Sequence, residues 1–82
     1  MKTYLKKTHL NGQIEIVAFN SDNLTVVSTF YNEIQFDRYE DSEHFNRVLE
    51  RHKEEFYPAT REEFNDLFLT HVQELNSITK EL

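Results

Sequence analysis

Histidines are the residues best suited to chemistry in this sequence, because imidazole exchanges protons near neutral pH and is the commonest metal ligand. His52 and His71 each fall within an apolar stripe at helical spacing, so an antiparallel pair of helices would bring them face to face. Zinc requires three or four ligands, whereas the chain has no Cys and no His-Glu-x-x-His spacing. We therefore expect structural histidines, and we assign no metal site.

Carboxylates gather in segment 37–43, which reads Asp-Arg-Tyr-Glu-Asp-Ser-Glu. Acidic side chains before a helix accept hydrogen bonds from its free N–H groups and oppose its macrodipole, which accounts for them without a ligand. The segment lacks the alternating ligands and central Gly of a calcium loop. Its remaining functional interpretation is an acidic surface that imitates nucleic acid.

Enzymatic machinery has little support in the sequence. The single Gly lies in a turn signal, so there is no phosphate-binding Gly-rich loop and no nucleophile elbow. The paired carboxylates Glu54-Glu55 and Glu62-Glu63 are adjacent, and adjacent residues on a helix diverge by about 100°. The sequence predicts a protein without catalytic residues and without a cofactor.

The composition of the 82 residues, 38% hydrophobic and 29% charged, predicts one ordered domain spanning 1–82. No apolar run approaches the roughly 18 residues of a membrane span, and the first residues lack the apolar core of a signal peptide, so we expect a cytoplasmic protein without membrane contact. Scarce Gly, Ala, Arg and Pro favour an AT-rich bacterial or phage gene. The net charge of −6, concentrated in residues 31–82, disfavours binding to duplex nucleic acid.

Residues 1–40 are predicted to form an antiparallel β-meander of three to four strands. Asn11-Gly12 is typical of a two-residue type I′ hairpin turn, and segment 21–23 separates the next two apolar runs as a three-residue loop. A weaker turn at Asn32-Glu33 leads into a fourth strand over 34–39. The alternative is that residues 24–39 form one long bent strand.

Residues 41–82 are predicted to form an antiparallel helical hairpin. Apolar residues at helical spacing indicate a first helix over about 42–56, capped by Asp41 or Ser42 and ended by Pro58. Thr60 and Glu63 form a capping box, after which a second stripe indicates a helix from about 61 almost to the end. The fold class is therefore α+β, with both helices packed on one face of the sheet.

The turn registers assign the strand side chains to two faces, because directly paired residues point the same way. Leu5, Ile16, Ala18 and Val26 fall on the face expected under the helices. The opposite face is too apolar to stay uncovered, so it is a candidate interface, made of Tyr4, Val17, Phe19, Val27, Tyr31, Ile34 and Phe36. A bulge near Asn32 is the alternative, since it would return Ile34 and Phe36 to the helix side.

These observations favour a small acidic, non-enzymatic binding or regulatory protein that acts through protein–protein contacts. Its partner is expected to be a second copy, in a homodimer, or another protein. Two alternatives stay open: a site for a nucleotide-like small molecule at a dimer interface, and an acidic inhibitor that imitates nucleic acid. Leu69 is expected to be exposed, because it lies about 140° from the apolar stripe of its helix.

Overall fold

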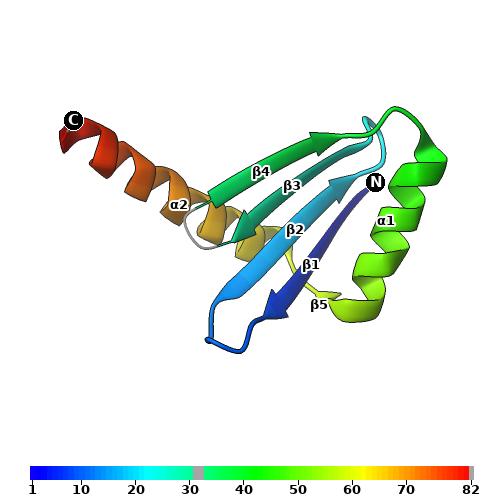
Figure 1. Ribbon diagram of the computed structural model, residues 1–82, viewed down its shortest axis with the longest axis horizontal. Coiled ribbons are helices and arrows are strands. Elements are labelled where there is room, and N and C mark those ends of the chain that lie inside the picture. Colours follow the sequence, from blue (N-terminus) through cyan, green and yellow to red (C-terminus); the bar gives the residue numbers. More distant parts are fainter. Residues whose placement is uncertain (31–32, 82) are drawn as a thin grey trace.

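The computed structural model describes residues 1–30 and 33–81 and shows an antiparallel sheet followed by two helices (Figure 1). The meander consists of β1 (Lys2–Thr8), β2 (Ile14–Asn20), β3 (Thr25–Phe30) and β4 (Glu33–Arg38). It is followed by α1 (Ser42–Glu55), the short strand β5 (Tyr57–Pro58) and α2 (Arg61–Glu81). The strand order is β4-β3-β2-β1-β5. The α+β class, the separate fourth strand and the two successive helices are confirmed.

Both helices begin at the residues that the sequence indicates. The Asp41 side chain accepts a hydrogen bond from the His44 N–H at 2.7 Å and caps α1. At α2, the Glu63 N–H donates to the Thr60 hydroxyl oxygen at 3.1 Å, and the Thr60 N–H donates to the Glu63 carboxylate at 3.0 Å. This reciprocal pair is the predicted capping box.

Thr60→Ala should lower the free energy of unfolding by about 1 kcal/mol, because it removes an acceptor for one of the free N–H groups of α2. Urea denaturation followed by circular dichroism measures the change. The matched control is Thr70→Ala, in the middle of the same helix, where the hydroxyl bonds only to the Asp66 carbonyl and its loss should be nearly neutral. Equal effects at both positions would contradict the capping role.

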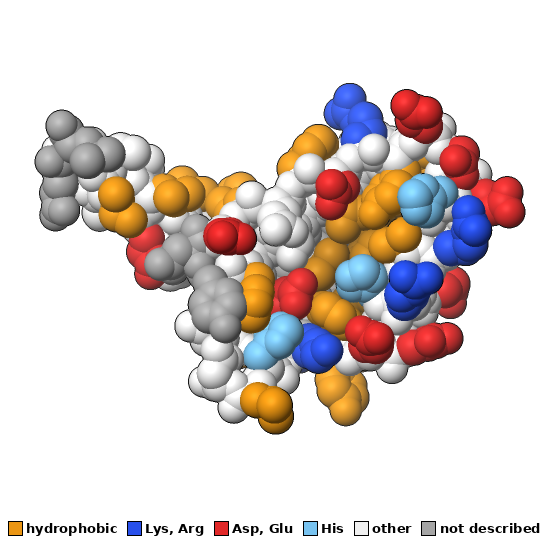
Figure 2. All heavy atoms as spheres, viewed as in Figure 1, with side chains coloured by type: hydrophobic (Ala, Val, Ile, Leu, Met, Phe, Trp, Pro, Cys, Tyr) orange, Lys and Arg blue, Asp and Glu red, His pale blue; other side chains and the backbone are white. Residues whose placement is uncertain are grey.

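The helix α1 covers one face of the sheet, called here the α1 face. Its Phe45 is fully buried and packs with Leu5, Val17, Phe19 and Val26, which form the hydrophobic core. The Phe45 and Phe19 rings meet edge to face, with centroids 5.9 Å apart. Figure 2 shows the hydrophobic side chains gathered along the seam between α1 and the sheet.

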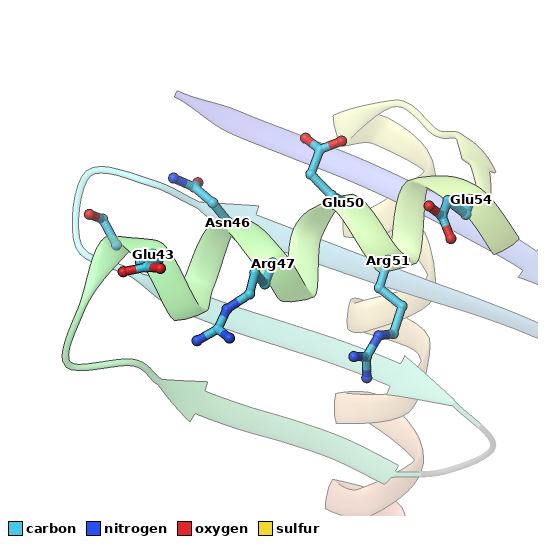
Figure 3. Close-up of a pocket in the computed structure, with 7 residues that line it drawn as sticks. Glu43, Asn46, Arg47, Glu50, Arg51 and Glu54 are labelled. Atoms are coloured by element: carbon cyan, nitrogen blue, oxygen red, sulfur yellow. The ribbon is translucent and has the colours of Figure 1, made fainter.

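The helix α2 covers the opposite face, called here the α2 face, so the expectation that both helices would pack on one face is wrong (Figure 3). The Phe64 ring lies 5.7 Å from that of Tyr4, which points away from the core residue Leu5. The chain changes face through β5, which pairs with the outer edge of β1, and Ala59 N–H donates to the Tyr4 carbonyl at 2.9 Å. The connection follows the sheet edge instead of reversing directly.

An ion pair fixes the start of α2 over β1. Lys6 Nζ lies 2.7 Å from a Glu63 carboxylate oxygen, and the hydrogen bond from Lys6, followed by that from the Thr60 backbone, lowers the pKa of Glu63. A lowered carboxyl pKa in the folded state stabilises the protein above the unfolded-state pKa, and this contribution is lost as the pH falls through the folded-state value. The pair is partly exposed, so water screens it and its main effect is to position α2.

The β1–β2 connection has three residues, 10–12, instead of the predicted two. His9 N–H donates to the Gln13 carbonyl at 2.8 Å, and Gly12 alone adopts a positive φ, of 85°. This is the pattern of a type I turn followed by a left-handed glycine. Leu5 consequently pairs with Val17 and not with Ala18. A shift of one residue turns every β2 side chain to the other face relative to β1.

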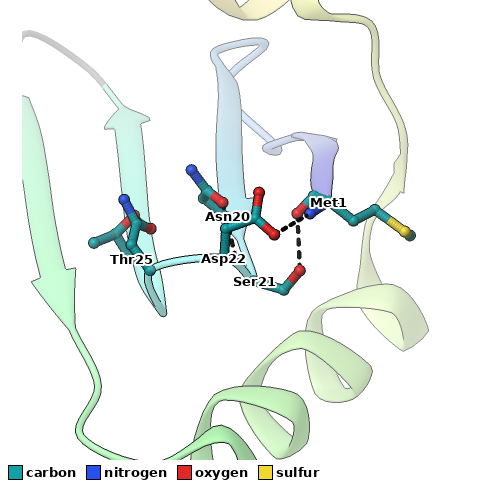
Figure 4. Close-up of polar contacts among 6 residues, drawn as sticks. Met1, Asn20, Ser21, Asp22 and Thr25 are labelled. Carbon is teal, nitrogen blue, oxygen red and sulfur yellow. Dashed lines mark hydrogen bonds and ion pairs between the residues drawn. The ribbon is translucent and has the colours of Figure 1, made fainter.

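The β2–β3 connection is also one residue longer than predicted, because Asn20 pairs with Thr25 and not with Leu24. Leu24 takes a positive φ of 57°, and the Asp22 N–H donates to the Asn20 side chain at 3.0 Å. The Met1 amino group binds Asp22 at 2.9 Å, which holds this loop against the start of β1 (Figure 4). The second shift cancels the first, so β1 and β3 keep their predicted faces and only β2 is reversed.

Phe30 pairs with Glu33, so residues 31–32 of the connection between β3 and β4 lie outside the described residues. Glu33, which was predicted to belong to the turn with Asn32, belongs to β4 instead. Ile34 and Phe36 pair with Thr29 and Val27. They therefore share the face of Val27, as the predicted fourth strand requires, and the alternative that returned them to the α1 side is wrong.

Candidate functional site

His52 and His71 lie on opposite sides of the sheet, so the expectation that they face one another is wrong. The His52 ring packs edge to face on Phe19 of the α1 face, with centroids 5.2 Å apart, and its Nδ1 lies 2.9 Å from the Val48 carbonyl oxygen. His71 belongs to α2 and is buried, and its Nδ1 has no hydrogen-bond partner among the described residues. With the sheet between them, the two imidazoles cannot share a ligand.

A polar cluster near the β1–β2 turn was not singled out in the sequence. His9 Nε2 lies 3.0 Å from one Glu15 carboxylate oxygen, and the Ser28 hydroxyl donates to the other at 3.3 Å. Nucleophilic activation of a serine requires its hydroxyl to bond to a base such as imidazole. Here the Glu15 carboxylate lies between the two, so the described structure shows no hydrogen bond between Ser28 and the His9 imidazole. Only the strand register brings these residues together, which explains why spacing along the chain gave no signal.

The carboxylates do not form an unbroken acidic surface on α1. The side of α1 that points away from the sheet carries Glu43, Glu50 and Glu54 interleaved with Arg47 and Arg51 (Figure 3). All these side chains come from one helix, and no other described element lines the surface they form, so it is open and convex. Alternating signs also do not reproduce the even negative charge of a phosphate backbone. Within residues 1–30 and 33–81, no three metal-ligating side chains come close enough together to hold a metal ion.

The residues of the predicted interface are divided between the two faces. Val17 and Phe19 are each 1% exposed beneath α1, so the prediction that they lie on an open surface is wrong. Tyr31 lies outside the described residues. The remaining members share the α2 face, where Tyr4, Val27 and Ile34 are half-buried and Phe36 is 58% exposed.

A hollow of about 240 Å³, called here the α2 groove, lies between α2 and the part of the α2 face that this helix leaves open. Its apolar lining comes from Phe64 of the helix and from four residues of the sheet: Tyr4, Ala18, Phe19 and Val27. Its charged lining residues are both cations, and its polar ones are uncharged: Lys2, Arg61, Asn20, Asn65 and Thr25. A region without carboxylates is notable in a chain of net charge −6.

The end of α2 projects beyond the sheet (Figure 1). Residues 73–80, called here the α2 arm, are all exposed, including Leu75 at 42% and Ile78 at 52%. Both continue the side of α2 on which Phe64 packs against Tyr4 and His71 is buried, at spacings of three and four residues. Figure 2 shows the resulting line of hydrophobic side chains along the projecting helix.

Leu69 is 54% exposed, as predicted, and lies one helical turn beyond Asn65 on the groove side of α2. The α2 arm, Leu69 and Phe36 thus all belong to the α2 side of the molecule. They are the candidate interaction surface.

None of the described helices is both long enough and apolar enough to cross a membrane. Comparison with protein-family models, with curated proteins and with solved structures finds no match to this chain.

Proposed function

We propose that this chain is a non-enzymatic binding protein that acts through protein–protein contacts made by the α2 arm. The observation that carries the proposal is the exposure of Leu75 and Ile78 on the same side of α2 that contacts the sheet earlier in the helix. An amphipathic helix normally buries its apolar stripe. The arm has no sheet beneath it, so a partner has to supply the covering surface.

The polar clusters support a binding role better than a catalytic one. The cluster of His9, Glu15 and Ser28 has no serine–imidazole bond. His52 and His71 lie on helices on opposite sides of the sheet. Helix-in-groove recognition, by contrast, needs only apolar anchors spaced by three or four residues on one helix side. Leu75 and Ile78 have that spacing.

The proposal predicts that Ile78→Asp abolishes binding to whatever partner the wild-type chain retains. Chemical cross-linking in cells, followed by mass spectrometry of the purified bait, measures the partner set. Leu10→Asp is the matched control, because Leu10 is a fully exposed leucine at the β1–β2 turn, remote from α2. The proposal is wrong if Ile78→Asp and Leu10→Asp baits retain the same partners as wild type.

The α2 groove favours a second function, the binding of a small anionic molecule such as a nucleotide. Lys2 and Arg61 would neutralise a phosphate, and Tyr4 and Phe64 offer apolar contact to a planar ring. Titration of adenosine monophosphate into the labelled protein, followed by NMR, should then shift groove resonances, and Arg61→Ala should weaken the binding. Shifts that are absent, or spread evenly over the surface, would exclude this function.

A further inference from the structure

Resting on the proposed role of the arm, we infer that its partner is a second copy of this chain, with the two α2 helices side by side and antiparallel. Each arm then lies over the α2 face of the other copy, next to Phe36 and Leu69. The contact is isologous, so it closes on itself and forms a dimer.

The chain exposes more surface than a compact chain of its mass, as expected for a chain with a projecting arm that a second copy covers. A compact protein of 9.9 kDa exposes about 5,200 Å² according to the scaling of surface with mass, whereas this chain exposes 6048 Å². The excess, about 850 Å², is close to the roughly 800 Å² that each partner contributes to a standard interface. The Cα radius of gyration is 13.6 Å, against about 12 Å for a compact chain of this length.

The carboxylates of α2 leave one side of the helix free for close approach. Five of its residues are acidic, but the groove-side flank carries none: Asn65, Leu69, Val72, Asn76 and Thr79. At 100° per residue these five residues form one continuous strip beside the apolar stripe. The centres of protein interfaces are depleted of charged side chains. A second α2 packed against this strip would bury no carboxylate from it.

The position of the α2 arm at the edge of the sheet is compatible with a second copy related by twofold symmetry. β4 is an edge strand of the sheet, and the arm projects past that edge (Figure 1). A twofold axis perpendicular to the sheet beside β4 keeps both α2 helices on the same side of the two sheets. The apolar stripe of each arm, including Leu75 and Ile78, then faces the α2 face of the other sheet, where Phe36 is 58% exposed.

Sedimentation equilibrium over a dilution series tests the dimer. The wild-type chain should sediment with twice the mass of one chain, and Ile78→Glu should raise the dissociation constant by at least about tenfold, because it places a charge among apolar side chains. Far-ultraviolet circular dichroism should be unchanged, since Ile78 is already exposed in one chain. Leu10→Glu, the matched control, should dissociate like wild type.

Cross-linking tests the antiparallel arrangement, because the chain has no cysteine of its own. The antiparallel strip places Leu69 of one copy near Asn76 of the other. A short bis-maleimide should therefore link a mixture of Leu69→Cys and Asn76→Cys chains to each other, and link Leu10→Cys chains weakly. Linking that is no greater in the mixture than with Leu10→Cys would overturn the arrangement.

A wild-type chain that remains monomeric at millimolar concentration would overturn the inference of a second copy. In that case, cross-linked partners that are present with the wild-type bait and absent with the Ile78→Asp bait would still support the proposed function. The arm would then bind a different protein. A dimer that survives Ile78→Glu would overturn the assignment of the arm to the contact. The two proposals can therefore fail independently.

Discussion

Phe45→Ala should remove a large part of the stability of this protein. Phe45 has no exposed surface and contacts the core from α1, and truncation of a buried Phe to Ala costs about 3–5 kcal/mol. A chain of 82 residues has a total stability of about 4–12 kcal/mol by the usual values per residue. The variant should therefore unfold at a much lower urea concentration, or be largely unfolded without urea.

Phe36→Ala is the matched control for this prediction, because Phe36 is 58% exposed on the edge strand β4. Its truncation removes little buried surface within one chain and should cost less than about 1 kcal/mol. Both variants should be compared with wild type at a protein concentration at which the chain is monomeric, because Phe36 also lies at the proposed dimer contact and dimerisation would make the midpoint depend on concentration. If Phe45→Ala unfolds at the same midpoint as Phe36→Ala, the assigned core is wrong.

The helices were predictable because their signals are local. The Asp41 side chain accepts a hydrogen bond from the backbone N–H three residues later, and Thr60 and Glu63 bond to each other across one turn. Such bonds depend on neighbours in the chain and not on the remainder of the fold. The bounds of both helices consequently agree with the sequence to within about one residue.

The strand registers were not predictable, because one dipeptide is compatible with two turns. Asn11-Gly12 fits a two-residue loop with two positive φ angles, and it equally fits a three-residue loop in which Gly12 alone is left-handed. The next loop contains Leu24 at a positive φ. Leucine rarely adopts this conformation, so the residue type gives no indication of it. The packing of Val17 and Phe19 against Phe45 is a long-range contact, and the turn residues contain no information about it.

The placement of the helices depended on a strand of two residues. The sequence indicates that Tyr57 is extended, because it precedes Pro58, but not that the segment pairs with the edge of β1. That pairing takes the chain around the sheet to the α2 face. The exposure of the α2 arm could not be predicted for a similar reason. The apolar spacing through Leu75 and Ile78 is the same whether or not the sheet extends beneath this part of the helix.

Phe19→Asp separates the observed register from the predicted one. In the predicted register Phe19 lies on an open face, so the aspartate would leave the helices intact and only disturb an interface. In the observed register Phe19 is 1% exposed and contacts the rings of Phe45 and His52. An aspartate there is a buried charge without a partner, whose desolvation costs several kcal/mol in addition to the lost packing.

We therefore expect Phe19→Asp to unfold the chain, with loss of the helical circular dichroism signal and of chemical-shift dispersion. Phe36→Asp is the matched substitution on the other face: its carboxylate would stay in water beside Arg38, whose guanidinium lies 5.8 Å from the present ring, so the fold should survive. A Phe19→Asp chain that keeps its helical signal, as the predicted register requires, would contradict the observed register. Because both substitutions replace Phe by Asp on a strand, the difference between them reports mainly the burial of Phe19, and it shows which side of β2 forms the core.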